Sequence, residues 1–307
     1  MQSIQVFRAE ELMDGSVNEE VMQDDYSAWM PQGKDFVPAL KIKLKKSLPK
    51  GAYRIDFDNR SGECVFSPAS IDTDEIYQFD KTLPDLILKE VKDFWEREPV
   101  YKAHNLLHKR GMLLEGSAGN SKTSTINLLI KSLLERDGLI FLVNSPKEFQ
   151  CIYYALSNVV RQIEPDRPII TIIEDIDQLI SNLGTDADVL DFLDGKHSIN
   201  HHLVIMTSNN TSDLSTALLR PSRIDMRFVL EVPTKEVRKA FLEKKGVSPE
   251  VSEEYAIKTE GMSFAQLKEI FISTVILGKD IDYAVSKVLH PIEARDYLSN
   301  SQPKIGL

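Results

Sequence analysis

The sequence predicts an α/β protein whose main domain has three layers, with helices covering both faces of a parallel sheet. Short apolar runs alternate with helical patterns between residues 83 and 232, which is typical of a buried parallel sheet. After Pro233 the apolar runs cease and only helical periodicity continues, so a small helical domain should follow. The part before residue 70 is irregular and β-rich, and forms an N-terminal β domain or β extension in this scheme.

The elements of the main domain follow from these patterns. A helix is expected first, because apolar residues recur at helical spacing from Leu86 to Trp95. The expected strands are residues 112–114, 139–143, 169–173, 203–206 and 228–230. The expected C-terminal helices are residues 235–244, 252–259, 263–277 and 281–289. The third of these has an apolar stripe formed by Phe264, Leu267, Ile270 and Phe271.

The N-terminal part contains three short strand patterns, at residues 39–44, 53–57 and 64–66. The last two flank an Asp/Asn/Gly-containing turn at residues 58–62, which predicts a β-hairpin. Residues 1–35 are acidic and weakly periodic. We therefore expect a β-rich domain at 1–79, a nucleotide-binding domain at 80–232, a helical lid at 233–290 and a polar tail at 291–307.

Composition excludes several classes of protein. The 307 residues are 42% hydrophobic and 27% charged, which is enough for a sizeable core. With 37 basic and 47 acidic side chains the net charge is −10, which argues against a general nucleic-acid-binding surface. The widely spaced Cys64 and Cys151 signal neither a disulfide framework nor a zinc site. No signal peptide or membrane-spanning pattern is evident, so we expect a cytoplasmic protein that does not enter the membrane.

Residues 116–123 read Gly-Ser-Ala-Gly-Asn-Ser-Lys-Thr, close to the phosphate-binding P-loop pattern. An apolar run precedes the motif and a helical pattern follows it, as a P-loop requires. Lys122 would bridge the β- and γ-phosphates of ATP, and the Thr123 hydroxyl would hold Mg²⁺. The residues expected to bind the nucleotide are Gly116, Ser117, Ala118, Gly119, Asn120, Ser121, Lys122, Thr123 and Ser124.

Ser121 departs from this pattern, because glycine is expected before the lysine. A Cβ atom at this position would crowd the phosphates, and a positive φ there would strain the backbone. The alternative interpretation of the motif is a Gly/Ser-rich turn that binds nothing.

Three further features fall at the ends of expected strands or in the loop that follows them. Glu174 and Asp175 end the run at 169–173, where one carboxylate can hold Mg²⁺ and the next can polarise water. Asn209 follows the run at 203–206 and can orient that water. Arg220 and Arg223 are suited to stabilising the charge of a phosphate in the transition state. Each has a plain alternative: a solvent-exposed acidic cluster, a polar turn, or surface ion pairs.

Together these features resemble the AAA branch of the AAA+ ATPases, over about residues 80–289. Residues 110–116 resemble that family's entry to the P-loop, residues 193–195 its Leu/Met-Asp-Gly element, and residues 261–267 its lid signature, with Phe264 replacing a small residue. The resemblance implies a homo-oligomeric ring, usually a hexamer, in which Arg220 and Arg223 reach the ATP of the neighbouring subunit. It also implies a central pore.

The order Glu174-Asp175 inverts the family's common Asp-Glu ending and resembles the mitochondrial respiratory-complex assembly chaperones. Carried over by position, Glu174 lies on the Mg²⁺ side and Asp175 is the catalytic acid. That chaperone type has a membrane anchor for which this sequence shows no pattern, so its location and substrate are not carried over. No His-Glu-x-x-His motif is present, and the sequence therefore lacks the zinc ligands of the AAA proteases.

The leading hypothesis is an ATPase that remodels or unfolds a protein or a complex. A nucleotide-binding scaffold with little turnover is the alternative that Ser121 suggests, and a DNA-handling AAA+ protein ranks third because of the negative charge. Phe149 lies where related proteins place a pore loop, but it is better interpreted as a core residue of the following helix.

Overall fold

The computed structural model describes residues 26–32, 35–42, 45–58, 63–70, 82–194 and 199–290. The chain forms two compact units, residues 1–49 and residues 50–307. In the first unit, β1 (Tyr26–Gln32) pairs antiparallel with β2 (Asp35–Ile42). The strand expected at 39–44 therefore begins four residues earlier, and it has a partner strand that was not expected. Residues 1–25 and the tail after residue 290 lie outside the described part.

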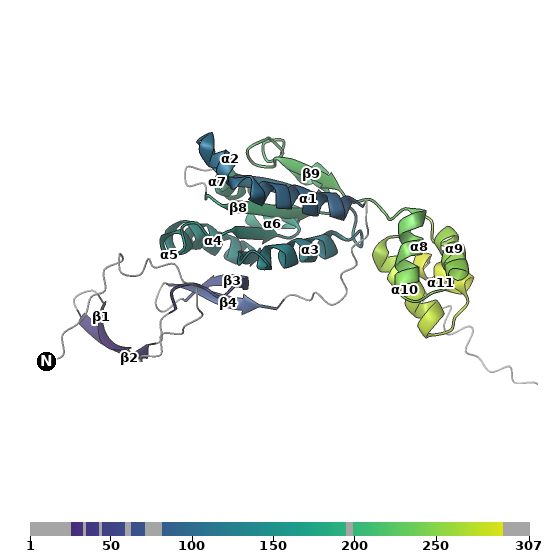
Figure 1. Ribbon diagram of the computed structural model, residues 1–307, viewed down its shortest axis with the longest axis horizontal. Coiled ribbons are helices and arrows are strands. Elements are labelled where there is room, and N and C mark those ends of the chain that lie inside the picture. Colours follow the sequence, from purple (N-terminus) through teal and green to yellow (C-terminus); the bar gives the residue numbers. More distant parts are fainter. Residues whose placement is uncertain are drawn as a thin grey trace, which may run out of the picture. The chain divides into compact units, whose positions relative to one another are not determined.

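A seven-stranded sheet organises the second unit, with the strand order β4-β3-β6-β7-β8-β5-β9 (Figure 1). All neighbouring strands pair in parallel except β3 and β4. The strands are β3 (Gly51–Phe57), β4 (Cys64–Ala69), β5 (Lys109–Glu115), β6 (Leu139–Val143), β7 (Ile169–Ile173), β8 (His202–Ser208) and β9 (Met226–Val229). The mainly parallel sheet confirms the expected fold class, and the bounds of β6 and β7 agree with the apolar runs.

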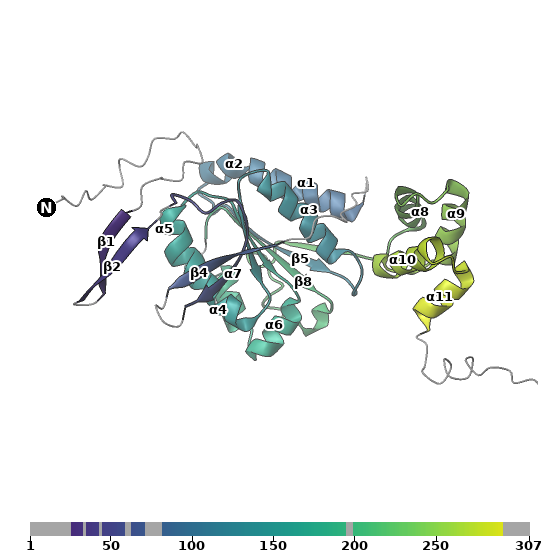
Figure 2. The same ribbon diagram turned by 90° about the horizontal axis from the view of Figure 1, so that it is seen from below.

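Helices cover both faces of this sheet. Figure 2 shows α1 (Leu83–Glu96) and α3 (Lys122–Leu134) on one face and α4 (Pro146–Ala155) and α6 (Ile176–Leu183) on the other. The remaining helices of this layer structure are α2 (Glu98–Ala103), η2 (Leu156–Val160), α5 (Arg161–Ile163), α7 (Ala187–Asp194) and η3 (Thr211–Asp213). The three-layer arrangement buries the strands on both faces, which is why their sequences are continuous apolar runs instead of alternating ones.

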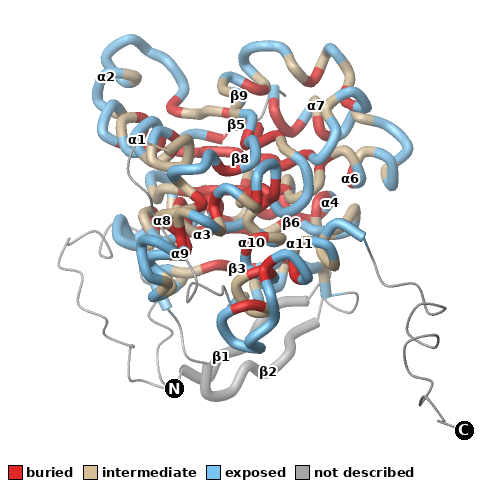
Figure 3. The backbone as a smooth tube through the Cα atoms, turned by 90° about the vertical axis from the view of Figure 1, so that its right-hand side faces the viewer, coloured by how far each residue is buried: buried red, intermediate tan, exposed pale blue. Residues whose placement is uncertain are grey.

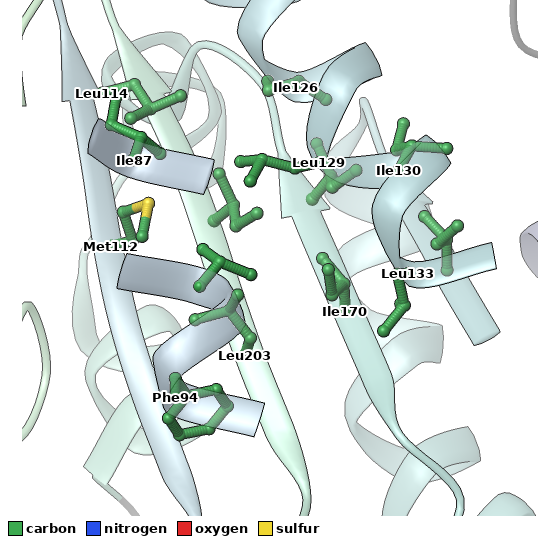
Figure 4. Packing of buried hydrophobic residues seen from close by; sticks show 14 of the residues in the cluster. Ile87, Phe94, Met112, Leu114, Ile126, Leu129, Ile130, Leu133, Ile170 and Leu203 are labelled. Carbon is green, nitrogen blue, oxygen red and sulfur yellow. The ribbon is translucent and has the colours of Figure 1, made fainter. Parts of the chain in front are cut away.

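The main core lies between the sheet and the pair of helices α1 and α3 (Figure 4). Met112 and Leu114 of β5 and Leu203 of β8 meet Ile87 of α1 and Leu129 of α3, and all five side chains are fully buried. Figure 3 shows buried residues concentrated on the strands, with exposed residues on the outer surfaces of the helices. Each such side chain contributes about 1.5–3 kcal/mol through its removal from water, so this packing fixes the positions of the strand ends.

The hairpin formed by β3 and β4 belongs to the main sheet and not to a separate domain. β3 pairs in parallel with β6, from Gly51 opposite Leu139 to Tyr53 opposite Phe141. The sheet therefore includes two strands that precede the domain boundary expected at residue 79. The sequence pattern of a strand predicts which residues are buried but not which strand pairs with it. Sequence alone therefore could not place this hairpin. Turn residues 59–62 lie outside the described part.

Phe149 is a core residue. It is 2% exposed, and its ring packs edge-to-face against Phe192 with 5.5 Å between the ring centroids. Helix α4 continues through η2 into α5, so residues 146–163 form one uninterrupted helical segment that includes a π-turn. The possibility that Phe149 lines a pore is therefore wrong, and its interpretation as a core residue is confirmed.

The C-terminal helices are α8 (Lys235–Lys244), α9 (Pro249–Lys258), α10 (Phe264–Phe271), η4 (Ile272–Ile276) and α11 (Ile281–Leu289). Serine, threonine or aspartate caps begin α8, α9, α10 and α11, and Ser263 with Gln266 forms a capping box at α10. The buried Arg238 guanidinium joins two of these segments by donating to the carbonyls of Pro233 and Ala256. Nowhere in the described ranges does a helix combine the length and apolar character needed to cross a bilayer.

Replacement of Phe149 by alanine should lower the free energy of unfolding by about 3–5 kcal/mol, because it empties a buried aromatic site. Tyr154→Ala, on the same helix but at a half-exposed position, should cost only about 1 kcal/mol, a typical value for a single substitution. Urea denaturation followed by circular dichroism measures both. A destabilisation of Phe149→Ala no larger than that of Tyr154→Ala would contradict the core assignment.

Candidate nucleotide-binding site

The candidate site lies where β5, β7 and β8 end at one edge of the sheet. The register places Glu115 of β5 beside Ser208 of β8, and Ile173 of β7 beside Met206 of β8. The residues that follow these strands are therefore brought together: the loop from Gly116, the pair Glu174 and Asp175, and Asn209. Ligands of open parallel sheets bind at this carboxyl edge.

The loop after β5 keeps its glycines for steric reasons. Gly116 has a φ of 154°, and a Cβ atom there would lie 2.4 Å from the carbonyl oxygen of Leu230. Gly119 has a φ of 84°, and a Cβ atom there would lie 2.8 Å from the Ser263 hydroxyl oxygen. Helix α3 begins at Lys122, so its N-terminal N–H groups and dipole face the loop. The loop thus has the form expected for binding phosphate.

Lys122 is largely buried, and its ammonium group is enclosed by oxygen atoms. Its Nζ donates to the carbonyl oxygens of Gly116 at 2.5 Å and Ser117 at 3.2 Å, and to Asn209 Oδ1 at 2.7 Å. Burial lowers the pKa of Lys122, while the nearby carboxylates of Asp175 and Asp177 act in the opposite direction. In this arrangement the lysine satisfies its three donors with protein oxygens, which are positions that phosphate oxygens can take.

Asn209 connects the lysine to the acid. Its Nδ2 donates to Asp175 Oδ1 at 2.8 Å, while its Oδ1 accepts from Lys122. The Asp175 backbone N–H in turn donates to Thr207 Oγ1 at 2.9 Å, which fixes the strand end. A continuous chain of hydrogen bonds therefore runs from Lys122 through Asn209 to Asp175.

Glu174 occupies a different environment from Asp175. It is half-buried, and burial raises its pKa, with a smaller contribution from the negative charge of Asp175. Both acids line a cavity of about 210 Å³ that also includes Asn144 and Gln178. Asp175 is the member of the pair that bonds to Asn209, so the two carboxylates are not equivalent in the site.

The oxygen donors of the site suit Mg²⁺. Thr123 offers an exposed hydroxyl at the start of α3, and Glu174 a carboxylate. Asp177 has a buried Oδ1 without a hydrogen-bond partner. The described residues contain no cluster of three or more His, Cys, Asp or Glu that could form an all-protein metal site. Mg²⁺ is commonly held by one or two carboxylates together with substrate phosphates, and this donor set fits that mode.

Residues of the C-terminal helices complete the site. Ala265 N–H donates to the Gly119 carbonyl at 3.4 Å. The P-loop and these helices line an open pocket of about 510 Å³. Its lining residues are Ser117, Ala118, Gly119, Asn120, Val232, Gly261, Ser263, Ala265 and Gln266. The segment expected to be a lid signature therefore faces the loop, and the space between them is large enough for a ligand.

The two arginines, Arg220 and Arg223, differ in their exposure and in their contacts. Arg220 is exposed, and its guanidinium takes part in no hydrogen bond or ion pair with the described residues. Arg223 is half-buried: its Nη1 donates to the Ala217 carbonyl at 2.7 Å, and its Nε lies 3.4 Å from Asp194. Neither arginine contacts Lys122, Glu174 or Asp175 among the described residues, so the structure does not bring them to the P-loop of their own chain.

Three residues of the site were missed by sequence reasoning. Thr207 anchors the backbone of Asp175, Asp177 adds a carboxylate near Lys122, and Gln266 lines the larger pocket. The signal for Thr207 and Asp177 was present, because both are polar residues beside recognised strand ends. Gln266 lies within the expected lid signature at residues 261–267, but its approach to the loop depends on the position of the C-terminal helices.

The fold and the site have the form of a P-loop nucleotide-binding protein. Residues 112–232 match the family described as "ATPase family associated with various cellular activities (AAA)". Through this segment the chain is similar to the AAA family.

Similar curated proteins include two chaperones and a protease. A "Probable mitochondrial chaperone bcs1" from Schizosaccharomyces pombe is 28% identical over 201 residues, 61% of this chain and 43% of its own. A "Probable mitochondrial chaperone BCS1-A" from Dictyostelium discoideum is 26% identical over 64% of this chain and 49% of its own. An "ATP-dependent zinc metalloprotease FtsH" from Aster yellows witches'-broom phytoplasma is 28% identical over 66% and 34%. The chain thus spans about a third to a half of the length of these relatives.

Ser121 has a φ of 66° and a ψ of 13°, the left-handed conformation that favours glycine. A non-glycine residue there is strained by about 1–2 kcal/mol, whereas glycine costs about 0.5–1 kcal/mol in lost chain entropy. Ser121→Gly should therefore raise the free energy of unfolding by about 0.5–1 kcal/mol, as measured by chemical denaturation. Ser121→Ala keeps the strain and is the matched control. Equal stability of the two variants would show that the backbone at this position is not strained.

Proposed function

We propose that this chain binds ATP with Mg²⁺ at the edge of the sheet and hydrolyses it. The observation that carries the proposal is the hydrogen-bonded chain from Lys122 through Asn209 to Asp175, with distances of 2.7 and 2.8 Å. It links a phosphate-binding lysine to a carboxylate through a side chain that both donates and accepts. A phosphate and an attacking water placed along this chain would each meet a suitable partner.

In this proposal the residues have distinct roles. Lys122 and the loop N–H groups hold the phosphates, and Asp175 polarises the water that Asn209 orients. Thr123 and Glu174 would hold Mg²⁺, which neutralises developing phosphate charge when bound. The α/β part from residue 80 to 232 would act as the nucleotide-binding domain and residues 233–290 as its lid, because the larger pocket lies between them.

We also propose that the active form is a homo-oligomeric ring, with a hexamer as the expected size, that acts on a protein or a protein complex. Arg220 supports a ring, because an exposed guanidinium with no hydrogen bond or ion pair to the described residues is available to a neighbour's nucleotide. The similar proteins are called chaperones and a protease, which supports a protein substrate. The uninterrupted helix at residues 146–163 favours remodelling without an aromatic pore loop at Phe149.

A scaffold that binds nucleotide with little turnover remains the second candidate, favoured by the strained Ser121 in the P-loop. A large rise in turnover of Ser121→Gly over the natural sequence would support it. A role in handling DNA has less support because of the net charge of −10.

Lys122→Ala should weaken binding of a fluorescent ATP analogue at least tenfold, since it removes the buried cation of the phosphate site. Asp175→Asn should keep binding but slow phosphate release by about 10²–10⁴-fold, the usual contribution of a catalytic base. Both are measured on purified protein with magnesium. Phosphate release that is the same for the natural protein and Asp175→Asn would exclude the hydrolysis proposal.

Arg220→Ala and Asp175→Asn should each be inactive alone yet regain activity when mixed. Random mixing in a ring of head-to-tail contacts leaves about a quarter of the interfaces with both an intact acid and an intact arginine. Phosphate release of the mixture, compared with each variant alone, measures this recovery. Arg220→Ala with natural activity, or a mixture that gains nothing, would reject a role for this arginine in the neighbour's site.

A further inference from the structure

We propose that Asp225 is a positioning residue: it fixes the loop at residues 217–225 to strand β5, so that Arg220 is presented to the neighbouring subunit. This inference rests on the proposed function, because it assigns a support to the proposed trans-acting arginine. It also assigns Arg223 to the same support within its own chain.

Asp225 makes three backbone contacts that join the loop to the strand. Its Oδ2 accepts from the Gly111 N–H at 2.9 Å and its Oδ1 accepts from the Ser222 N–H at 2.9 Å. Its own N–H donates to the Gly111 carbonyl at 2.9 Å. One carboxylate therefore ties Ser222, two residues after Arg220, to the strand that ends in the P-loop.

Only glycine fits at position 111, where the loop backbone lies against β5. A Cβ atom at this position would lie 1.8 Å from the carbonyl oxygen of Arg223. Real Cβ atoms do not approach backbone oxygen that closely, so only glycine lets the loop lie directly on the strand. The requirement for glycine and the two hydrogen bonds to Asp225 are independent signs of the same close docking.

Arg223 stabilises the start of the loop at residues 217–225. Its guanidinium bonds to the Ala217 carbonyl and lies beside Asp194, which also accepts from the Ser222 hydroxyl at 3.4 Å. The half-buried Lys109 donates to the Leu193 carbonyl and lies near both Asp194 and Asp225. The loop is thus held at both ends, and Arg220 is left as its exposed cation.

Rigid placement matters because a flexible arginine loses side-chain and loop entropy when it engages a phosphate. Arginine fingers contribute about 10³–10⁵-fold to rate where they have been measured in GTPases. A poorly placed Arg220 should therefore lose much of this rate enhancement. The loss should appear in kcat, with little change in the affinity of the variant's own P-loop for nucleotide.

Asp225→Asn tests this with no change in side-chain size. An amide has one acceptor oxygen, so one of the two N–H groups from Gly111 and Ser222 would face an NH₂ group. We expect turnover to fall at least tenfold, with binding of a fluorescent ATP analogue within twofold of the natural protein. Asp191→Asn, an exposed aspartate on α7, makes the same charge change away from the loop and should leave both quantities unchanged.

Mixing separates misplacement of Arg220 from general damage. Asp225→Asn mixed with Asp175→Asn should regain activity, because the second chain supplies a well-placed arginine to the intact site of the first. Asp225→Asn mixed with Arg220→Ala should not recover, since both lack a usable arginine. Natural turnover in Asp225→Asn, or no recovery with Asp175→Asn, would overturn the inference. If the natural protein releases no phosphate, the proposed function fails first, and the two failures are distinguishable.

Discussion

The parallel pairing of β5, β7 and β8 is the constraint on which the site depends. Parallel strands end at the same edge, and register then decides which residues face one another. Here β5 and β7 both pair with β8, so the P-loop and the acidic pair flank Asn209. The bonds from Lys122 to Asn209 and from Asn209 to Asp175 span three strands. A shift of one residue in this register would turn every side chain of the shifted strand to the other face and separate these groups.

The residues that precede two of the helices at this edge have an unusual, left-handed backbone conformation. Ser121 precedes α3 and Asp175 precedes α6, and both have a positive φ, at 66° and 47°. Neither is glycine, so Ser121 is strained by about 1–2 kcal/mol, while aspartate adopts this conformation more readily than serine. The structure compensates locally: Thr125 Oγ1 donates to the Ser121 carbonyl at 2.9 Å, and Asp175 N–H donates to Thr207. Such strain gathers at functional sites, because the turn must aim N–H groups or a carboxylate at a ligand.

Much of the fold follows from the sequence, because buried parallel strands have a strong signature. The runs at 139–143 and 169–173 have the bounds of β6 and β7, and the helices at 235–244 and 281–289 have those of α8 and α11. The P-loop lysine, the acids and Asn209 could be predicted as site residues because each follows the end of a recognisable strand. The position of β3 beside β6 could not be found this way. Ala52, Tyr53 and Ile55 are buried, but β6, the strand that pairs with β3 at Leu139–Phe141, lies more than 80 residues away in the sequence.

The two arginines show most clearly what sequence cannot supply. Arg220 and Arg223 are the same residue type and lie three positions apart in one loop. The sequence pattern therefore predicts the same role for both. Their contacts differ, because Asp194 and the Ala217 carbonyl reach Arg223 but not Arg220. That difference depends on Gly111, more than 100 residues earlier, which allows the loop backbone to approach β5. Arg220 and Lys122 thus lie on segments that are both anchored to strand β5. If Arg220 binds a phosphate of the neighbouring subunit, it would pull on the loop at residues 217–225. This loop is hydrogen-bonded to β5, the strand that leads into the P-loop of the same chain as Arg220. In the ring that we propose, this arrangement would form a short mechanical connection between adjacent sites, through the two backbone N–H groups that donate to the Asp225 carboxylate.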